Sequence, residues 1–174
     1  VFVPPQKKEL YQQLFGDTTT IIEAITDIES KPTKLKILFR SIARAAIPTE
    51  TIWIRQIYSW KETHNPFAFL WKRGMWYLGH FSWFRQIIHW MEYALFRDDH
   101  LWDQFFDTYT LDAVFATNVI HDVSIALMKA AKRRTIPCIG MVKSWDNLSS
   151  KGLLRFHPPV LLVNNDIMRK EAIE

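Results

Sequence analysis

Cysteine and glycine are both scarce in this chain of 174 residues, and their scarcity excludes several classes of protein. The single cysteine, Cys138, rules out a disulfide framework and a thiolate zinc site, and it favours a reducing compartment. The five glycines form neither a GxGxxG turn nor a P-loop, so a dinucleotide-binding enzyme is disfavoured. The histidines show no metal-ligand spacing, and we expect neither a metal nor an organic cofactor.

Long uncharged stretches and a strong net charge are also missing. The aromatic-rich span 67–96 does not predict a membrane-spanning helix because three cations interrupt it: Lys72, Arg73 and Arg85. No signal peptide is visible at the start of the sequence. The net charge of +4, without a run of five basic residues, weakly favours phosphates or acidic lipid headgroups, and we expect no nucleic-acid partner.

Aromatic residues are abundant instead, with eight Trp, twelve Phe and five Tyr, mostly between Trp53 and Phe106. Three- and four-residue spacing predicts a block of five helices across about residues 32–108. The first helix carries three cations at four-residue spacing: Lys36, Arg40 and Arg44. On the fourth helix we expect one polar face in solvent: Arg85, His89 and Glu92.

Two interpretations of the aromatic helices are open. The rings either form a core between the helices and a sheet, or they make a patch that binds a membrane surface. Trp, Phe and cations mixed on amphipathic helices suit the interface between lipid and water. An enzyme that acts on a lipid-linked acceptor needs such a patch.

The stretch Leu111–Asn147 predicts a strand, a helix, a second strand and a polar loop. Asp112–Ala116 and Ile136–Val142 are short apolar runs of the kind that buried parallel strands show. Between them an apolar stripe has helical spacing: Ile120, Val123, Leu127, Ala130 and Ala131. A parallel strand–helix–strand unit crosses over right-handedly, so both strands end at one edge of the sheet, where ligands of open α/β sheets bind.

The first 25 residues repeat this pattern: a strand tail at Val1–Val3, a helix that ends at Gly16, and a strand at Thr18–Ile25. Near the other end, Val160–Val163 predicts a strand followed by a helix capped by Asn164 or Asn165, with Ile167, Met168 and Ala172 on its inner face. We therefore predict an α/β fold, a Rossmann-like parallel sheet with flanking helices and a large aromatic-rich helical insertion at about 32–108. Residues 1–174 form a single domain in this prediction. The chain lacks an initiator methionine and stops inside a helical pattern, so we expect a piece of a longer protein.

Polar residues follow both strands of the central unit, and they are the best functional candidates in the sequence. For catalysis the candidates are Asp146, His121 and Asp122. For substrate binding they are Asn118, Lys143, Ser144, Trp145, Asn147 and Lys151.

Each candidate has a structural alternative beside its chemical role. Asp146 is either a general base for an acceptor hydroxyl or a turn residue. His121 can exchange a proton near neutral pH, whereas Asp122 either shares that role or complements the helix dipole. Trp145 stacks on a sugar or anchors a core, and Asn118 binds substrate or caps the helix. The two candidate lysines contact phosphate or are solvated.

Three segments together resemble the N-terminal half of GT-B-type glycosyltransferases: Asp112–Ala131, Ile136–Val142 and Ser144–Gly152. The chain is also similar to sugar-nucleotide 2-epimerases and to polyol-phosphate polymer transferases of surface-polysaccharide synthesis. The resemblance covers the last 65 residues well, the first 25 loosely and the helical block hardly at all. It implies two Rossmann-like domains facing a cleft, with the donor nucleotide held mainly by the C-terminal domain, a half that this sequence does not include. The Gly-rich turn that many members place near the donor phosphates is also missing.

The resemblance leads to two hypotheses of function, and the Trp-rich helices lead to a third. The first is the acceptor-side domain of a glycosyltransferase that moves a sugar from a nucleotide sugar to a glycan or lipid-linked acceptor. It implies a cytoplasmic protein, peripheral on the inner face of the membrane, and a fragment that is inactive without its donor half. The second is a sugar-nucleotide 2-epimerase, and the third is a non-catalytic module that binds a membrane or another protein.

Overall fold

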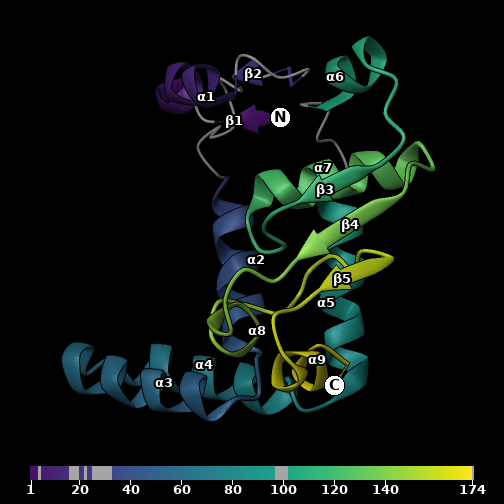
Figure 1. Cartoon of the computed structure of the whole chain (residues 1–174). Helices are drawn as coiled ribbons and strands as arrows, with labels where there is room; N and C mark the ends of the chain where they lie inside the picture. Colours follow the sequence, from purple (N-terminus) through teal and green to yellow (C-terminus); the bar gives the residue numbers. More distant parts are fainter. Residues whose placement is uncertain (4, 16–19, 22, 25–32, 97–101, 174) are drawn as a thin grey trace. The chain divides into compact units, whose positions relative to one another are not determined.

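A computed structural model describes residues 1–3, 5–15, 20–21, 23–24, 33–96 and 102–173 of the chain. The chain divides into two compact units, Val1–Thr33 and Lys34–Glu174. Each unit carries its own small parallel sheet (Figure 1), so the protein is a mixed α/β structure in which helices predominate.

The first unit contains strand β1 (Phe2–Val3), a 3-10 turn η1 (Pro5–Lys7), helix α1 (Lys8–Phe15) and strand β2 (Glu23–Ala24). The two strands pair in parallel, with Phe2 opposite Glu23. The predicted strand–helix–strand order is therefore confirmed in this unit. The second strand is shorter than the predicted Thr18–Ile25, several residues of which lie outside the described part, as does the predicted cap Gly16.

The second unit is built on a sheet of three parallel strands in the order β3-β4-β5: Val114–Ala116, Cys138–Met141 and Val160–Leu162. Helix α7 (Asp122–Arg133) connects β3 to β4 and packs on both strands. Each strand is shorter than its apolar run in the sequence, because a parallel ladder extends only as far as its neighbour pairs. Cys138 is buried, as predicted. The expected parallel sheet with flanking helices is thus confirmed.

In the described part of this unit, five helices precede the sheet, as the sequence predicts: α2 (Lys34–Ala45), α3 (Glu50–Thr63), α4 (Pro66–Leu78), α5 (Ser82–Leu95) and α6 (Asp103–Thr108). Side-chain caps fix two of their starts. The Thr49 hydroxyl accepts a hydrogen bond from the Ile52 amide, and the Asn65 carbonyl oxygen accepts one from the Ala68 amide, at 3.0 Å. α3 packs against α4, and α2 also contacts α4.

One core cluster of this unit lies where α2 meets α5. Its fully buried members are Phe39, Ala43, Ala46 and Ile88. Gly79, at the end of α4, packs directly on the backbone of Ala46, and any side chain at this position would collide with the Ala46 carbonyl group. This close approach requires glycine, and it brings the end of α4 against the end of α2.

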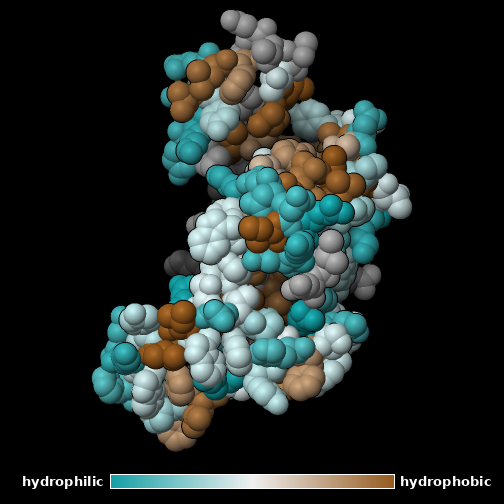
Figure 2. All heavy atoms as spheres, turned by 60° about the horizontal axis from the view of Figure 1, so that its bottom comes forward, coloured by the Kyte–Doolittle hydropathy of each residue, from teal (hydrophilic) through white to brown (hydrophobic). Residues whose placement is uncertain are grey.

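Many aromatic side chains do not enter this core. Helix α4 has no buried side chain, and Phe67, Leu70 and Tyr77 on it are 83%, 65% and 64% exposed. Trp83 and Trp90 on α5 are also more than half exposed. Figure 2 shows hydrophobic residues standing among hydrophilic ones over the α3–α4 end of the molecule. Within the described residues, no helix combines the length and the apolar character that crossing a bilayer requires.

Two short helices follow β4 and β5. The segment predicted as a polar loop forms one helical turn, α8 (Asp146–Ser149), and the chain ends with α9 (Asp166–Ile173). Asn165 is the cap of α9, because its side-chain oxygen Oδ1 accepts a hydrogen bond from the Met168 amide at 2.9 Å. Met168 is buried as predicted, but the prediction that Ile167 faces inward is wrong, since Ile167 is 71% exposed.

Candidate functional site

The candidate site lies at the carboxyl edge of the three-stranded sheet. β3 and β4 pair directly, with Ala116 opposite Gly140, so the turns that follow them start side by side. Gly140 itself makes room for the turn, because a Cβ there would meet the Val119 side chain at 2.7 Å and Pro158 at 2.8 Å. The absence of a side chain at this position lets the turn after β3 pack closely over the central strand.

Asn118 shapes that turn. Its side-chain oxygen accepts hydrogen bonds from the backbone amides of Ile120, at 2.8 Å, and His121, at 3.3 Å. The prediction that Asn118 is the N-cap of the following helix is wrong: His121 holds that position, without a side-chain cap bond. The Asn118 side chain instead closes an Asx turn just before the helix, and this turn leads the chain into α7.

His121 presents an exposed imidazole at the N-terminus of α7. No hydrogen bond or ion pair of its side chain occurs within the described part of the chain. The first amide groups of the twelve-residue helix α7 carry the positive end of its dipole. An uncommitted imidazole beside that end is chemically available to exchange a proton with a ligand.

Asp122, the next residue, is held by cations instead. The Arg155 guanidinium donates to its carboxylate at 2.6 Å, the Lys36 ammonium lies 3.5 Å away, and Arg40 also pairs with it. Only 17% of the Asp122 side chain is exposed. A carboxylate neutralised by three cations is well suited to fix the start of α7 and poorly suited to accept a proton.

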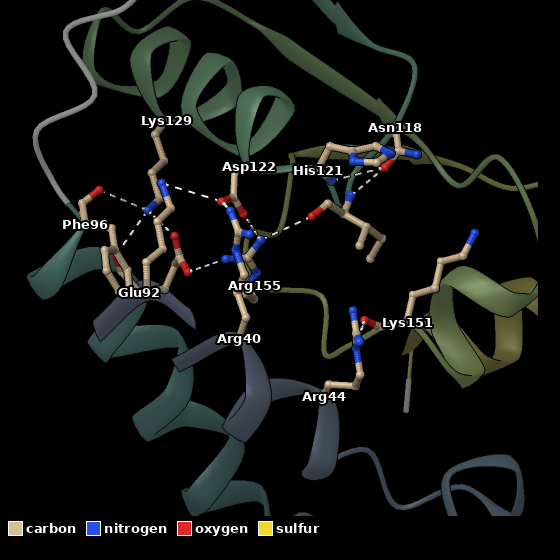
Figure 3. Close-up of polar contacts among 12 residues, drawn as sticks. Arg40, Arg44, Glu92, Phe96, Asn118, His121, Asp122, Lys129, Lys151 and Arg155 are labelled. Atoms are coloured by element: carbon tan, nitrogen blue, oxygen red, sulfur yellow. Dashed lines mark hydrogen bonds and ion pairs between the residues drawn. The ribbon is translucent and has the colours of Figure 1, made fainter. Parts of the chain in front are cut away.

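These contacts belong to a larger buried ion network, drawn in Figure 3 and defined by Glu92, Asp122, Lys129 and Arg155. The Glu92 carboxylate pairs with Lys129 at 2.6 Å and with Arg155 at 3.1 Å. Lys129 also donates to the backbone oxygens of Glu92 and Phe96. Burial lowers the pKa of Arg155, and the nearby Glu92 carboxylate acts in the opposite direction.

The network overturns two sequence predictions. Glu92 does not lie on a solvated face, since only 2% of it is exposed. The buried face of α7 is also not the predicted stripe: Ile125, Ala126 and Lys129 are buried, whereas Val123 and Leu127 are only half-buried. Ala130 and Ala131 are buried as predicted. The buried face therefore includes Lys129, which pairs with Glu92 on α5.

Sequence reasoning did not identify Glu92, Lys129 and Arg155 as one cluster. One signal was available for Lys129, which stands four residues after Ile125 and therefore on the same face of the helix. A lysine in an apolar stripe requires a buried anion, because an unpaired buried ammonium is very costly. The partner could not be identified, since Glu92 is 37 residues away in the sequence.

The turn after β4 holds the remaining candidates. The Asp146 carboxylate pairs with Lys151 at 3.0 Å. Hydrogen bonds from Lys151, and next from Ser144, hold the pKa of Asp146 below its ordinary value. Asn147 is buried; its side-chain oxygen accepts from Lys151 at 3.1 Å, and its amide nitrogen has no partner among the described residues.

Trp145 and Lys143 stand at the surface of this turn. Trp145 is 63% exposed, which excludes the interpretation that it anchors a core, and Lys143 is exposed beside it. Both side chains are therefore accessible to a ligand.

Helices α2 and α3 fix the position of this turn. The Thr49 hydroxyl donates to the Ser149 carbonyl oxygen at 2.6 Å, the Leu153 amide donates to the Ala43 carbonyl oxygen at 3.2 Å, and Arg44 donates to that of Lys151 at 3.4 Å. In the view of Figure 3 the Lys151 side chain extends towards the side where Asn118 and His121 lie. The sheet thus brings His121 and Asn118 to the same edge as Lys143–Asn147, while Asp122 is turned inward to the ion network.

Across the described residues, no three His, Cys, Asp or Glu side chains are placed to hold a metal ion. Comparison of the chain with protein-family models, with characterised proteins and with solved structures finds no significant match. The interpretation of the site therefore depends on its own geometry.

Proposed function

We propose that this chain is the acceptor-side, Rossmann-like domain of a GT-B-type glycosyltransferase. It would help to move a sugar from a nucleotide donor to a glycan or lipid-linked acceptor, as a cytoplasmic protein on the inner face of the membrane. The observation that carries the proposal is the parallel pairing of β3 with β4, which starts the turns of His121 and Trp145 at one sheet edge. That edge is where open α/β sheets bind their ligands.

We assign the roles from the contacts and the exposure of each side chain. A transfer that inverts the sugar needs a base for the acceptor hydroxyl. His121 is exposed, and its imidazole makes no hydrogen bond among the described residues, so we assign it this role. Asp146 is a weaker base because Lys151 and Ser144 lower its pKa, and we assign it to positioning the acceptor.

The other candidates serve binding. Exposed Trp145 offers a ring face on which a sugar can stack, and Lys143 offers a charge for a donor phosphate. Asn118 and Asn147 shape their turns, and Asp122 fixes the start of α7. The nucleotide sugar is a substrate in this proposal, and no cofactor takes part.

The test is a transfer assay on the full-length protein with three variants. We expect His121→Gln to lower kcat by about 10²- to 10⁴-fold, as loss of a general base does. Asp146→Asn should mainly raise the KM for the acceptor. His64→Asn is the matched control, because His64 is an exposed histidine between α3 and α4 whose left-handed backbone asparagine tolerates. Undiminished turnover of His121→Gln would refute the assigned base.

The same assay without an acceptor separates transfer from epimerisation. A transferase leaves the sugar of the nucleotide donor unchanged in its configuration when no acceptor is present. An epimerised nucleotide sugar in this arm would contradict transfer and support the related 2-epimerase activity.

A membrane-binding module is the second candidate function, and the exposure of α4 favours it. Phe67 and Leu70 stand far out of the core, on a helix that also carries Lys72 and Arg73. Such a mixture suits the lipid–water interface. Co-sedimentation with phosphatidylcholine vesicles, with and without phosphatidylglycerol, tests it; the Phe67→Ser/Leu70→Ser double variant should reduce binding, and Ile167→Ser on α9 should not. Absence of binding to either vesicle would refute this candidate.

A further inference from the structure

An open cavity of about 450 Å³ lies between α2, α3 and α4. Four of its lining residues are cations: Arg40, Arg44, Arg55 and Lys72. Among the residues that the structure describes, no acidic side chain lines it. Cations of three helices therefore line one concave surface, and the described lining contains no acidic side chain to neutralise them.

The cations are also poorly neutralised from outside the lining. Arg40 pairs with Asp122, but Arg44, Arg55 and Lys72 have no carboxylate within ion-pair distance in the described part of the chain. Arg44 donates only to the Lys151 carbonyl oxygen, and Lys72 to the Ser59 hydroxyl at 3.3 Å, within that same part. Clustered cations with walls of lower dielectric constant focus a positive potential that attracts an anion.

Gln56 adds a second and independent requirement. It lines the same cavity, is only 5% exposed, and uses its amide nitrogen to donate to the Lys72 carbonyl oxygen at 3.2 Å. Its side-chain oxygen has no hydrogen-bond partner among the described residues. A buried acceptor without a donor is costly, so the ligand that fits here brings a hydroxyl or N–H group beside its negative charge.

We propose that this cavity binds a phosphate group carried on a polyhydroxylated chain, the chemistry of a sugar phosphate or polyol phosphate. Lys72 and the arginines bind the phosphate, and a ligand hydroxyl donates to the Gln56 side-chain oxygen. The same chemistry occurs in soluble sugar phosphates and in the headgroup of phosphatidylglycerol. The proposal does not depend on the transfer reaction at the sheet edge.

Isothermal titration calorimetry of the purified chain at low salt tests it, with glucose 1-phosphate, inorganic phosphate and glucose as probes. We expect glucose 1-phosphate to bind about tenfold more tightly than inorganic phosphate, because only glucose 1-phosphate can donate a sugar hydroxyl to Gln56 while the cations bind its phosphate. Glucose should show no binding. A separate arm titrates phosphatidylglycerol vesicles, with phosphatidylcholine vesicles as the control. If the chain binds phosphatidylglycerol vesicles more tightly than soluble glucose 1-phosphate, the natural ligand is the lipid headgroup.

Variants locate the binding in the cavity. Lys72→Gln and Arg55→Gln should each weaken binding of glucose 1-phosphate about tenfold, as loss of one charge-assisted hydrogen bond does. Lys61→Gln is the matched control, since Lys61 is an exposed cation on α3 outside the lining. Gln56→Met should abolish the preference for glucose 1-phosphate over inorganic phosphate and leave the affinity for inorganic phosphate unchanged. Circular dichroism melting verifies that each variant is folded.

Three results would overturn the proposal. One is the absence of heat with every phosphate and with phosphatidylglycerol vesicles. Another is an equal loss of affinity in Lys61→Gln and Lys72→Gln, which would mean diffuse attraction to a basic surface. The third is equal affinity for glucose 1-phosphate and inorganic phosphate, which would exclude the role of Gln56.

Discussion

The buried ion network and the basic cavity use the same kinds of side chain in opposite ways. In the network, the carboxylates of Glu92 and Asp122 neutralise Lys129 and Arg155 at 2.6–3.1 Å. In the cavity, Arg44, Arg55 and Lys72 have no carboxylate partner among the described residues. The network therefore balances its charges internally, whereas three cavity cations remain available to an anionic ligand.

Arg40 belongs to both regions. It lines the cavity and pairs with Asp122 at the start of α7. Burial, and next the nearby charge of Arg155, lower the pKa of Arg40, which indicates crowding of positive charge around it. An anion in the cavity would relieve this crowding, so the two regions are electrostatically coupled through one residue.

The largest expected effect comes from breaking the network at its centre. Glu92→Gln leaves Lys129 buried without a carboxylate partner and Arg155 with Asp122 alone, and we expect a loss of about 3–5 kcal/mol in the free energy of unfolding. Urea unfolding followed by far-UV circular dichroism measures it. Glu62→Gln, on the exposed side of α3, is the control and should change stability by less than about 0.5 kcal/mol. A loss of similar size in both variants would contradict a matched, structural network.

Removing Glu92, Lys129 and Arg155 together should cost much less stability than removing Glu92 alone. In the triple variant Glu92→Leu, Lys129→Met and Arg155→Leu no charge of these three is left unpaired, and Asp122 keeps Lys36 and Arg40. Apolar replacement of a buried ion network is often nearly neutral, so we expect stability within about 2 kcal/mol of the native chain. The same urea titration applies. A triple variant less stable than Glu92→Gln would show that the network contributes net stability.

The difference between the two regions also explains what the sequence could predict. The parallel strand–helix–strand unit of β3, α7 and β4 and the five helices depend on local periodicity and turn chemistry, which a sequence displays directly. The row Lys36, Arg40 and Arg44 was visible for the same reason. The partners of these cations depend on long-range packing: Lys36 and Arg40 pair with Asp122, and Arg40 and Arg44 line the cavity.

The ion network and the basic cavity were not predicted, because their contacts join residues far apart in the sequence. Glu92 and Arg155 are 63 residues apart, and the cavity takes its cations from three different helices. The position of His121 and Trp145 at one edge of the sheet could be predicted, because neighbouring parallel strands end at one edge. The pairing of Asp122 with cations could not be predicted, because its partners Lys36 and Arg40 lie on α2 and Arg155 lies on the loop before β5.

A smaller effect is expected from an unmatched charge. Lys72→Gln removes one of four clustered cations, and we expect the free energy of unfolding to stay within about 0.5 kcal/mol of the native value or to rise slightly. Added phosphate should raise the melting temperature of the native chain, because a ligand of the folded state stabilises it. The rise should be smaller in Lys72→Gln and unaltered in Lys61→Gln. A strongly destabilised Lys72→Gln would mean that this cation is structurally matched.

The smallest expected effect is a pH dependence at the border of the network, where the His89 and His157 rings lie 4.4 Å apart and His89 contacts the Arg155 carbonyl oxygen. Burial lowers the pKa of both imidazoles below the ordinary 6.5. For His89 the hydrogen bond to the Arg155 carbonyl oxygen and the Glu92 carboxylate act in the opposite direction, towards a higher pKa. The unfolded chain therefore binds more protons, and stability should fall as the pH drops through and below the ordinary value. Urea unfolding between about pH 8 and about pH 5.5 measures the slope, which should be shallower in His157→Gln; an equal slope would remove this pair as its cause.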